Sequence, residues 1–170
     1  MASIDQNLVR SIIEDKLAVE LAASPAVPVV FHNQPYIPTS NSSWVQCLTS
    51  FGQSQYLTLG GETDSSNSVI GITAINVFTP KGVGSGANLD ICSRIRNLFN
   101  REILTRYIYR ILLEDGSFLL LEDGSYLLLD EPLPEVHIDP PIGPDIVRSP
   151  APEGYFQTQM RITFEAFEDL

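Results

Sequence analysis

The chain has 170 residues, of which 44% are hydrophobic, and it carries a formal net charge of −11. This length predicts a single domain with a sizeable core, and no apolar run reaches the roughly 20 residues that a membrane-spanning helix needs. The acidic balance argues against sequence-specific DNA binding, because an acidic surface repels the phosphate backbone of nucleic acid.

An amphipathic helix is predicted near the start of the chain. Apolar residues recur every three or four positions over residues 4–21, which is the spacing of one buried helical face. Ser3 and Gln6 have the spacing of a capping box, so Ser3 is the expected N-terminal cap. The helix is expected to end near Ala23, because Pro25 disfavours helical conformation in the residue before it.

Strands are predicted in the next part of the chain. Residues 29–31 form a short extended piece, and residues 44–51 are rich in aromatic and other β-forming side chains. Residues 53–58 either extend this second strand or begin another. Residues 68–78 are apolar at nearly every position and are followed by Pro80, which predicts a strand covered on both faces.

A second helix is predicted over residues 87–101, with Ile91 and Ile95 on its inner face. The glycine-rich residues 81–86 precede it. A phosphate-binding P-loop requires Lys and Ser/Thr after its last glycine, and these are missing here. We therefore expect a connector rather than an anion site. A strand over residues 103–113 is expected to follow the helix.

The most distinctive feature of the chain is a repeat in residues 114–129, where Glu-Asp-Gly-Ser-Phe-Leu-Leu-Leu is followed by Glu-Asp-Gly-Ser-Tyr-Leu-Leu-Leu. Asp-Gly favours a tight turn, and leucines beside an aromatic residue favour a strand. The repeat therefore predicts a β-ribbon with turns at residues 115–116 and 123–124. Strands this short are marginal in isolation, so the main body or another subunit must cover their leucines.

We interpret residues 112–147 as an insertion within a single domain that spans residues 1–170. The insertion contains the ribbon and a proline-rich acidic segment, with nine acidic residues and no Lys or Arg. Prolines are too frequent between residues 132 and 152 for a central strand, so this stretch is expected to wrap the surface.

The chain is expected to close on a strand with one buried face. From residue 159 onward polar and apolar residues alternate, which places Met160, Ile162 and Phe164 on the buried side. The order of all these elements predicts an α+β fold, in which a mostly antiparallel β-sheet is flanked by two helices and carries the inserted acidic β-ribbon.

Few residues have the spacing of a catalytic or metal site. Cys47 and Cys92 are far apart and outside any C-x-x-C pair, which predicts buried thiols. His137 and Asp139 would need further ligands to hold a metal, and the other histidine, His32, lies in a distant segment. No catalytic residue, metal or cofactor is therefore predicted, and a structural, assembling protein is favoured over an enzyme.

Arginines gather in the second predicted helix and in the strand after it. They form either a solvated surface or a contact with the acidic surface of a neighbouring copy, because a ring joins one patch to a different patch on the next subunit. The acids at the two ribbon turns are the expected partners in such a contact. The predicted interface residues are Arg94, Arg96, Arg101, Arg106, Glu114, Asp115, Glu122 and Asp123.

The order of these elements resembles the tail terminator proteins of tailed bacteriophages, over most of residues 1–105 and 153–167. The resemblance implies a small α+β protomer that forms a hexameric ring. Such a ring caps the tail tube, stops its polymerisation and offers a platform to neck or head-completion proteins, while DNA passes through the lumen without being read. The matching parts are the first helix before Val29-Val30-Phe31, the Trp44 strand, the strand that ends in Thr-Pro-Lys-Gly, the helix with Ile95-Arg96-Asn97-Leu98-Phe99, and the strand after Gly154-Tyr155-Phe156.

The residues leave other functions open. The protein is otherwise another neck or head-closure connector, a hydrolase that uses His137, or a monomeric adaptor that docks through residues 132–152. Under the terminator interpretation, the expected partners are other copies of the chain and the tail tube protein, with sheath and neck proteins as further candidates. The expected location is the host cytoplasm during assembly and then the junction of tail and neck in the virion, with no membrane involved.

Overall fold

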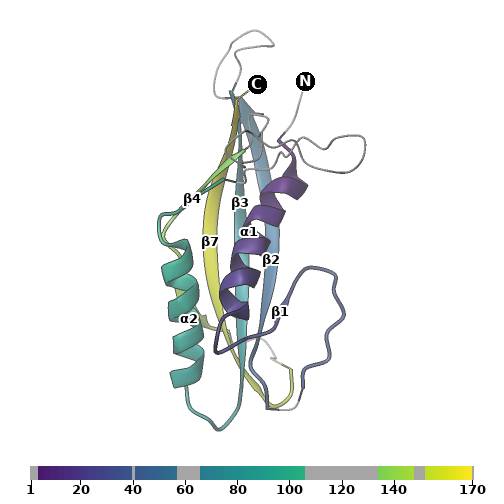
Figure 1. Ribbon diagram of the computed structural model, residues 1–170, viewed down its shortest axis with the longest axis vertical. Helices are drawn as coiled ribbons and strands as arrows, with labels where there is room; N and C mark the ends of the chain where they lie inside the picture. The colour runs from purple at the N-terminus through teal and green to yellow at the C-terminus, as the bar shows by residue number, and fades with distance from the viewer. Residues whose placement is uncertain (1–3, 40, 57–65, 106–133, 148–151, 170) are drawn as a thin grey trace, which may run out of the picture.

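The computed structural model describes residues 4–39, 41–56, 66–105, 134–147 and 152–169. In this part of the chain, one β-sheet carries two helices on the same face (Figure 1). The helices are α1 (Gln6–Ala22) and α2 (Gly86–Phe99). The strands are β1 (Val29–Val30), β2 (Trp44–Tyr56), β3 (Ser66–Pro80), β4 (Ile103–Leu104), β5 (Glu135–Ile138), β6 (Ile142–Ile146) and β7 (Tyr155–Asp169).

The sheet is built around three long antiparallel strands. Its order is β1-β2-β3-β7-β5-β4, and β6 pairs with β7 beside β5. β3 pairs with β2 on one side and with β7 along its whole length on the other. Among the described strands, only the short β1 runs parallel to its neighbour. The predicted α+β class, with a mostly antiparallel sheet and two helices, is confirmed.

Helix α1 begins at Gln6, two residues later than a cap at Ser3 would place its start. The Asp5 side chain accepts hydrogen bonds from the backbone N–H groups of Asn7 at 2.9 Å and Leu8 at 3.3 Å. A carboxylate at this position satisfies two N–H groups that have no partner within the helix. The assignment of Ser3 as the cap was therefore wrong. The helix ends at Ala22, followed by the capping residue Ala23, as the nearby proline predicted.

The structure shows whether the described part of residues 53–58 extends the second predicted strand or begins another one. β2 continues as one strand through a β-bulge between Phe51 and Ser54.

β7 has the predicted alternation, since Met160, Ile162 and Phe164 are all buried on the helix side. The predicted strand over residues 103–113 is confirmed at Ile103–Leu104, and the rest of it lies outside the described residues. The ribbon and its leucines also lie outside them.

The proline-rich stretch was expected to wrap the surface, and for β5 this prediction was wrong. β5 lies within the sheet, paired with β7 on one side and β4 on the other. Residues 135–138 contain no proline, so every residue of this short segment keeps the backbone N–H that a ladder needs. β6 does contain Pro144, and it lies at the sheet edge next to a register shift, where a proline is tolerated.

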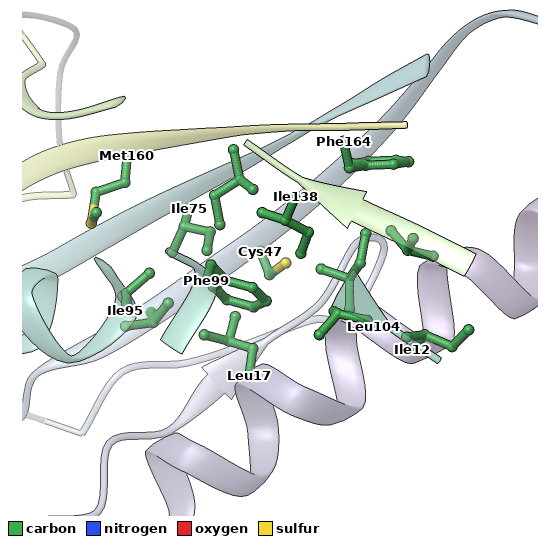
Figure 2. Close-up of a cluster of buried hydrophobic side chains, with 14 of the residues drawn as sticks. Ile12, Leu17, Cys47, Ile75, Ile95, Phe99, Leu104, Ile138, Met160 and Phe164 are labelled. Atoms are coloured by element: carbon green, nitrogen blue, oxygen red, sulfur yellow. The ribbon is translucent and has the colours of Figure 1, made fainter. Parts of the chain in front are cut away.

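A core of buried apolar side chains fills the space between the helices and the sheet (Figure 2). Leu17 of α1 and Ile95 and Phe99 of α2 pack toward Ile75 of β3 and Met160 of β7. Burying a side chain of this size contributes roughly 1.5–3 kcal/mol. This packing holds both helices on one face of the sheet and leaves the opposite face to other contacts.

Candidate interaction surfaces

Among the described residues, the face of the sheet opposite the helices is covered at one end only. There the loop after β1 places Tyr36 against Trp44, with ring centroids 5.1 Å apart, and Trp44 stacks on Phe78 at 3.9 Å. The Tyr155 hydroxyl donates to the carbonyl of Thr39 at 3.2 Å and holds the loop in place. The side chains of Trp44, Phe78 and Tyr155 are buried as a result.

The prediction that β3 is covered on both faces is therefore correct for only part of the strand. At its covered end, Phe78 is buried although it points away from the helices. Toward the other end, Ile70 and Ile72 are 40% and 48% exposed. Alternation along β3 separates both isoleucines from Ile75, which faces the helices, whereas their difference from Phe78 comes from a loop that reaches only one end of the strand.

A row of amide side chains separates the covered and uncovered parts of this face. Asn76 of β3 donates to the Oε1 atom of Gln46 on β2 at 3.2 Å, and Gln159 of β7 donates to Asn76 at 3.1 Å. The two hydrogen bonds link side chains of three neighbouring strands. Beyond it lies a surface that we name the bare face, formed by Ile70, Ile72, Thr163, Glu165 and His137.

The bare face contains a hollow of about 330 Å³. His137 stands at its side, 3.3 Å from the Oε2 atom of Glu135, and its ring packs edge-on against Phe167 at 4.9 Å. Together with Glu135, the lining residues Asp139 and Glu165 give this region three carboxylates. The described residues include no group of three or more His, Cys, Asp or Glu side chains placed to hold a metal ion.

The structure places Arg94 against its own chain. From α2, the guanidinium group of Arg94 lies 3.3 Å from Glu20 Oε1 and also donates to the backbone carbonyls of Glu20, Ala23 and Pro25. These carbonyls lie at the end of α1, where the last turn of a helix has no partners of its own. Sequence reasoning missed this contact, since a basic residue that faces a helix end 74 residues away leaves no local signal.

The other predicted arginines have different positions. Arg96 donates to the carbonyl of Gly143 in β6. Arg101 follows the last turn of α2 with a φ of 58°, is exposed, and forms no ion pair with another described residue. Arg106 and the acids Glu114, Asp115, Glu122 and Asp123 lie outside the described residues, so the predicted contact between arginines and ribbon stays a prediction.

A second exposed surface lies where α2 passes β6. Ile146 of β6 pairs with Thr158, whose hydroxyl donates to Asn88 of α2 at 2.6 Å. Leu89, the next residue of α2, is 48% exposed and Ile146 is 71% exposed. We name this surface the α2 flank and define it by Leu89, Ile146, Arg96 and Arg101. It combines two exposed apolar side chains with two arginines.

The titratable groups of the core do not form a nucleophilic site. Burial, with a smaller effect from Glu14, raises the pKa of the Cys47 thiol to about 12. Burial also raises the pKa of Cys92, against hydrogen bonding by Thr158. Both thiols are protonated at neutral pH, whereas a thiol nucleophile reacts as the thiolate. The predicted glycine-rich connector, residues 81–86, joins β3 to α2 through residues 81–85, and Gly86 is the first residue of the helix. No helix in the described ranges is long and apolar enough to cross a membrane.

Comparison with known proteins gives a family and a fold. A family model described as phage tail terminator protein matches residues 8–110, which is more than half of the chain. A solved structure superposes with a TM-score of 0.60 over 96% of this chain and 96% of its own, at 14% sequence identity; at that identity the likeness shows the fold alone. No curated protein matches the chain.

Proposed function

The chain belongs to the phage tail terminator family, and we propose that it forms a ring, expected to be hexameric, that caps the tail tube and ends tube polymerisation. Membership of the family makes it a structural protein of the bacteriophage tail that associates with other tail proteins. The proposal goes further in three respects, namely the ring, its number of copies and a connection from the tail to the neck. The tail tube protein is the proposed partner below the ring, with neck and sheath proteins as further partners.

The bare face is the observation that carries this proposal. Both helices pack on one side of the sheet, and Ile70 and Ile72 stay exposed on the other. Exposed apolar side chains grouped on a flat surface are typical of a site that another protein covers. A protein whose sheet is covered on one face and only partly on the other, in the part of the chain that the structure describes, is therefore suited to assembly with copies of itself or with other tail proteins.

The charge of the chain supports a passive passage for DNA. With a net charge of −11, the protein as a whole repels the phosphate backbone, and phosphate contacts dominate the affinity of DNA-binding proteins. A ring built from such subunits would let the genome pass without retaining it. We therefore include DNA in the proposal as a transported molecule and not as a specifically bound one.

The test measures the oligomeric state of the full chain and its effect on the growth of tail tubes. Light scattering after size exclusion, with negative-stain images of the peak, reports whether an open ring forms. Preformed tail tubes are then mixed with the protein, and the tube length is followed in the presence of free tube protein.

A ring that binds tube ends and stops their growth is the expected result. A protein that stays monomeric and leaves tube growth unchanged would contradict the proposal and favour the monomeric adaptor. Binding to neck or head-completion proteins without any effect on tubes would favour the alternative connector.

A further inference from the structure

We propose that the bare face of one copy packs against the α2 flank of the next copy. This inference rests on the proposed ring, and it identifies the two surfaces that join its subunits. The occupant of the bare face is thus a second copy of this chain, presenting Leu89, Ile146, Arg96 and Arg101. Apolar complementarity, charge and the relative position of the two surfaces each support this assignment.

Both surfaces offer apolar side chains that the monomer leaves in contact with water. Ile70 and Ile72 stand on the bare face, and Ile142 of β6 lies on the same side of the sheet with 55% exposure, since it pairs with Arg161. On the α2 flank, Leu89 and Ile146 are likewise exposed. Each such side chain that is removed from water contributes free energy in proportion to its buried apolar area.

The charges of the two surfaces are opposite. The bare face carries Glu165 and has Glu135 and Asp139 beside its hollow, and none of these is paired with a Lys or Arg among the described residues. Arg161 lies on the same side of the sheet, and its charge is offset by Asp145 at 3.4 Å. The α2 flank carries Arg96 and Arg101. Opposite charges across a contact set the register of the partners and disfavour like-charged surfaces.

The position of the two surfaces suits a ring. Figure 1 shows both helices on one side of the sheet. The residues of the bare face lie on the other side, because they alternate along the strands with the buried ones. A contact between two different patches is heterologous, and it closes into a ring when the rotation between copies permits. Two copies of the bare face in contact would instead place acidic groups opposite one another and would produce a closed dimer.

The first test reverses one charge on each surface. Glu165→Arg on the bare face and Arg101→Glu on the α2 flank are each expected to weaken ring formation at least about tenfold, the effect expected where like charges meet across a contact. An equimolar mixture of the two variants should form rings again, because each copy then meets a neighbour of opposite charge at both of its contacts. Glu153→Arg makes the same charge change at an exposed turn outside both surfaces and should form rings as the wild type does.

The second test uses cross-linking and benefits from the burial of both native cysteines. A double variant with Ile72→Cys and Leu89→Cys, treated with a flexible bis-maleimide, should give a ladder of multimers on a denaturing gel. Each single variant should give no ladder, since the proposed contact brings together two different surfaces. Pairing Ile72→Cys with Val19→Cys, on the 75% exposed outer side of α1, is the matched control and should also give no ladder.

Three outcomes have distinct meanings. Loss of rings in the single charge variants, recovery in the mixture and a ladder from the double cysteine variant support the inference. Wild-type rings together with intact rings in both charge variants and no ladder would overturn it while leaving the terminator function in place. A wild type that forms no ring in solution or on tube ends would overturn the inference and the proposed function together. Melting curves of each variant show whether the fold is retained.

Discussion

Gly71 of β3 shows how the absence of one side chain shapes the core. A Cβ atom at this position would lie 2.1 Å from the Cζ atom of Phe164 on the neighbouring strand β7. The Phe164 ring also packs edge-on against Phe51 at 5.7 Å, so it has little room to move. Glycine is therefore required here by close packing, in a strand where it would otherwise be unfavourable.

Substituting Gly71→Ala is expected to destabilise the protein by roughly 1–3 kcal/mol, the usual cost of overpacking a filled core. Gly86→Ala is the matched control, because a Cβ atom at that position meets nothing within 4 Å. Urea midpoints of the two variants measure the difference. Equal midpoints would mean that the Phe164 ring is free to move away.

Glu14 of α1, whose carboxyl group is largely buried, should make the stability of the protein depend on pH. Its side chain is only 15% exposed, and burial raises its pKa above the ordinary value of 4.5, against the attraction of Arg10 at 3.8 Å. The folded state thus binds this proton more tightly than the unfolded state does. The stabilising contribution of the Glu14 proton is fully present at a pH below the pKa that Glu14 has in the unfolded state. It is lost as the pH rises through the higher pKa of Glu14 in the folded state.

Glu14→Gln, which stays neutral at every pH, is therefore expected to be more stable than the wild type at neutral pH. The difference should disappear once the pH falls below 4.5. Urea unfolding over this pH range measures it, with Glu153→Gln as a control at an exposed site. A Gln variant less stable than the wild type at neutral pH would show that the ion pair with Arg10 outweighs the cost of burial.

At the scale of elements, Arg94 joins the two helices. Its guanidinium group bonds to carbonyls at the end of α1 while its backbone belongs to α2. Most of the stability that Arg94 contributes to the fold should come from these hydrogen bonds. Its ion-pair partner Glu20 is 37% exposed, and exposed ion pairs contribute little to the free energy of unfolding. Arg94 was predicted for a subunit interface, and this contact engages it within its own chain.

Arg94→Ala should lower the free energy of unfolding by roughly 1–3 kcal/mol, the range for hydrogen bonds to a charged group. Arg101→Ala, at an exposed position without an ion pair to another described residue, should change it by less than about 0.5 kcal/mol. Chemical denaturation of the monomer compares the two. Equal effects would contradict a stabilising role of the Arg94 hydrogen bonds within the chain.

At the scale of the whole molecule, the proposed ring contact combines isoleucines with opposite charges. Salt at about 1 M shortens the screening length to about 3 Å, from about 10 Å at about 0.1 M. The long-range repulsion between acidic copies is already largely screened at the lower concentration, so added salt acts mainly on the close charge pairs. Ring formation should therefore weaken with salt without disappearing, since the apolar contact persists.

Sedimentation velocity over this range of salt measures the effect. An equimolar mixture of the Glu165→Arg and Arg101→Glu variants should show the same dependence as the wild type, because its contacts are of the same kind. Rings that become tighter with salt would contradict a contribution from opposite charges and would leave the apolar side chains as the main attraction.

The sequence by itself determined the types and the order of both helices and of strands β1, β2, β3, β4 and β7, whereas β5 and β6 lie in a stretch that was expected to wrap the surface. Apolar spacing over residues 4–21 located α1, and the alternation around Ile162 located β7 and its buried face, because these periodicities are properties of neighbouring residues. The family resemblance was likewise visible in the order of the elements. The helix cap was misplaced because Ser3 and Asp5 are both suitable capping residues, and only the hydrogen bonds of Asp5 distinguish them.

The tertiary structure alone decided which surfaces remain exposed. It placed the loop around Tyr36 over one end of the sheet, left Ile70 and Ile72 bare, and inserted β5 between β4 and β7. It also bonded Arg94 to α1. Each of these depends on contacts between segments far apart in the chain, and their geometry follows from sheet register and packing, which local patterns do not contain.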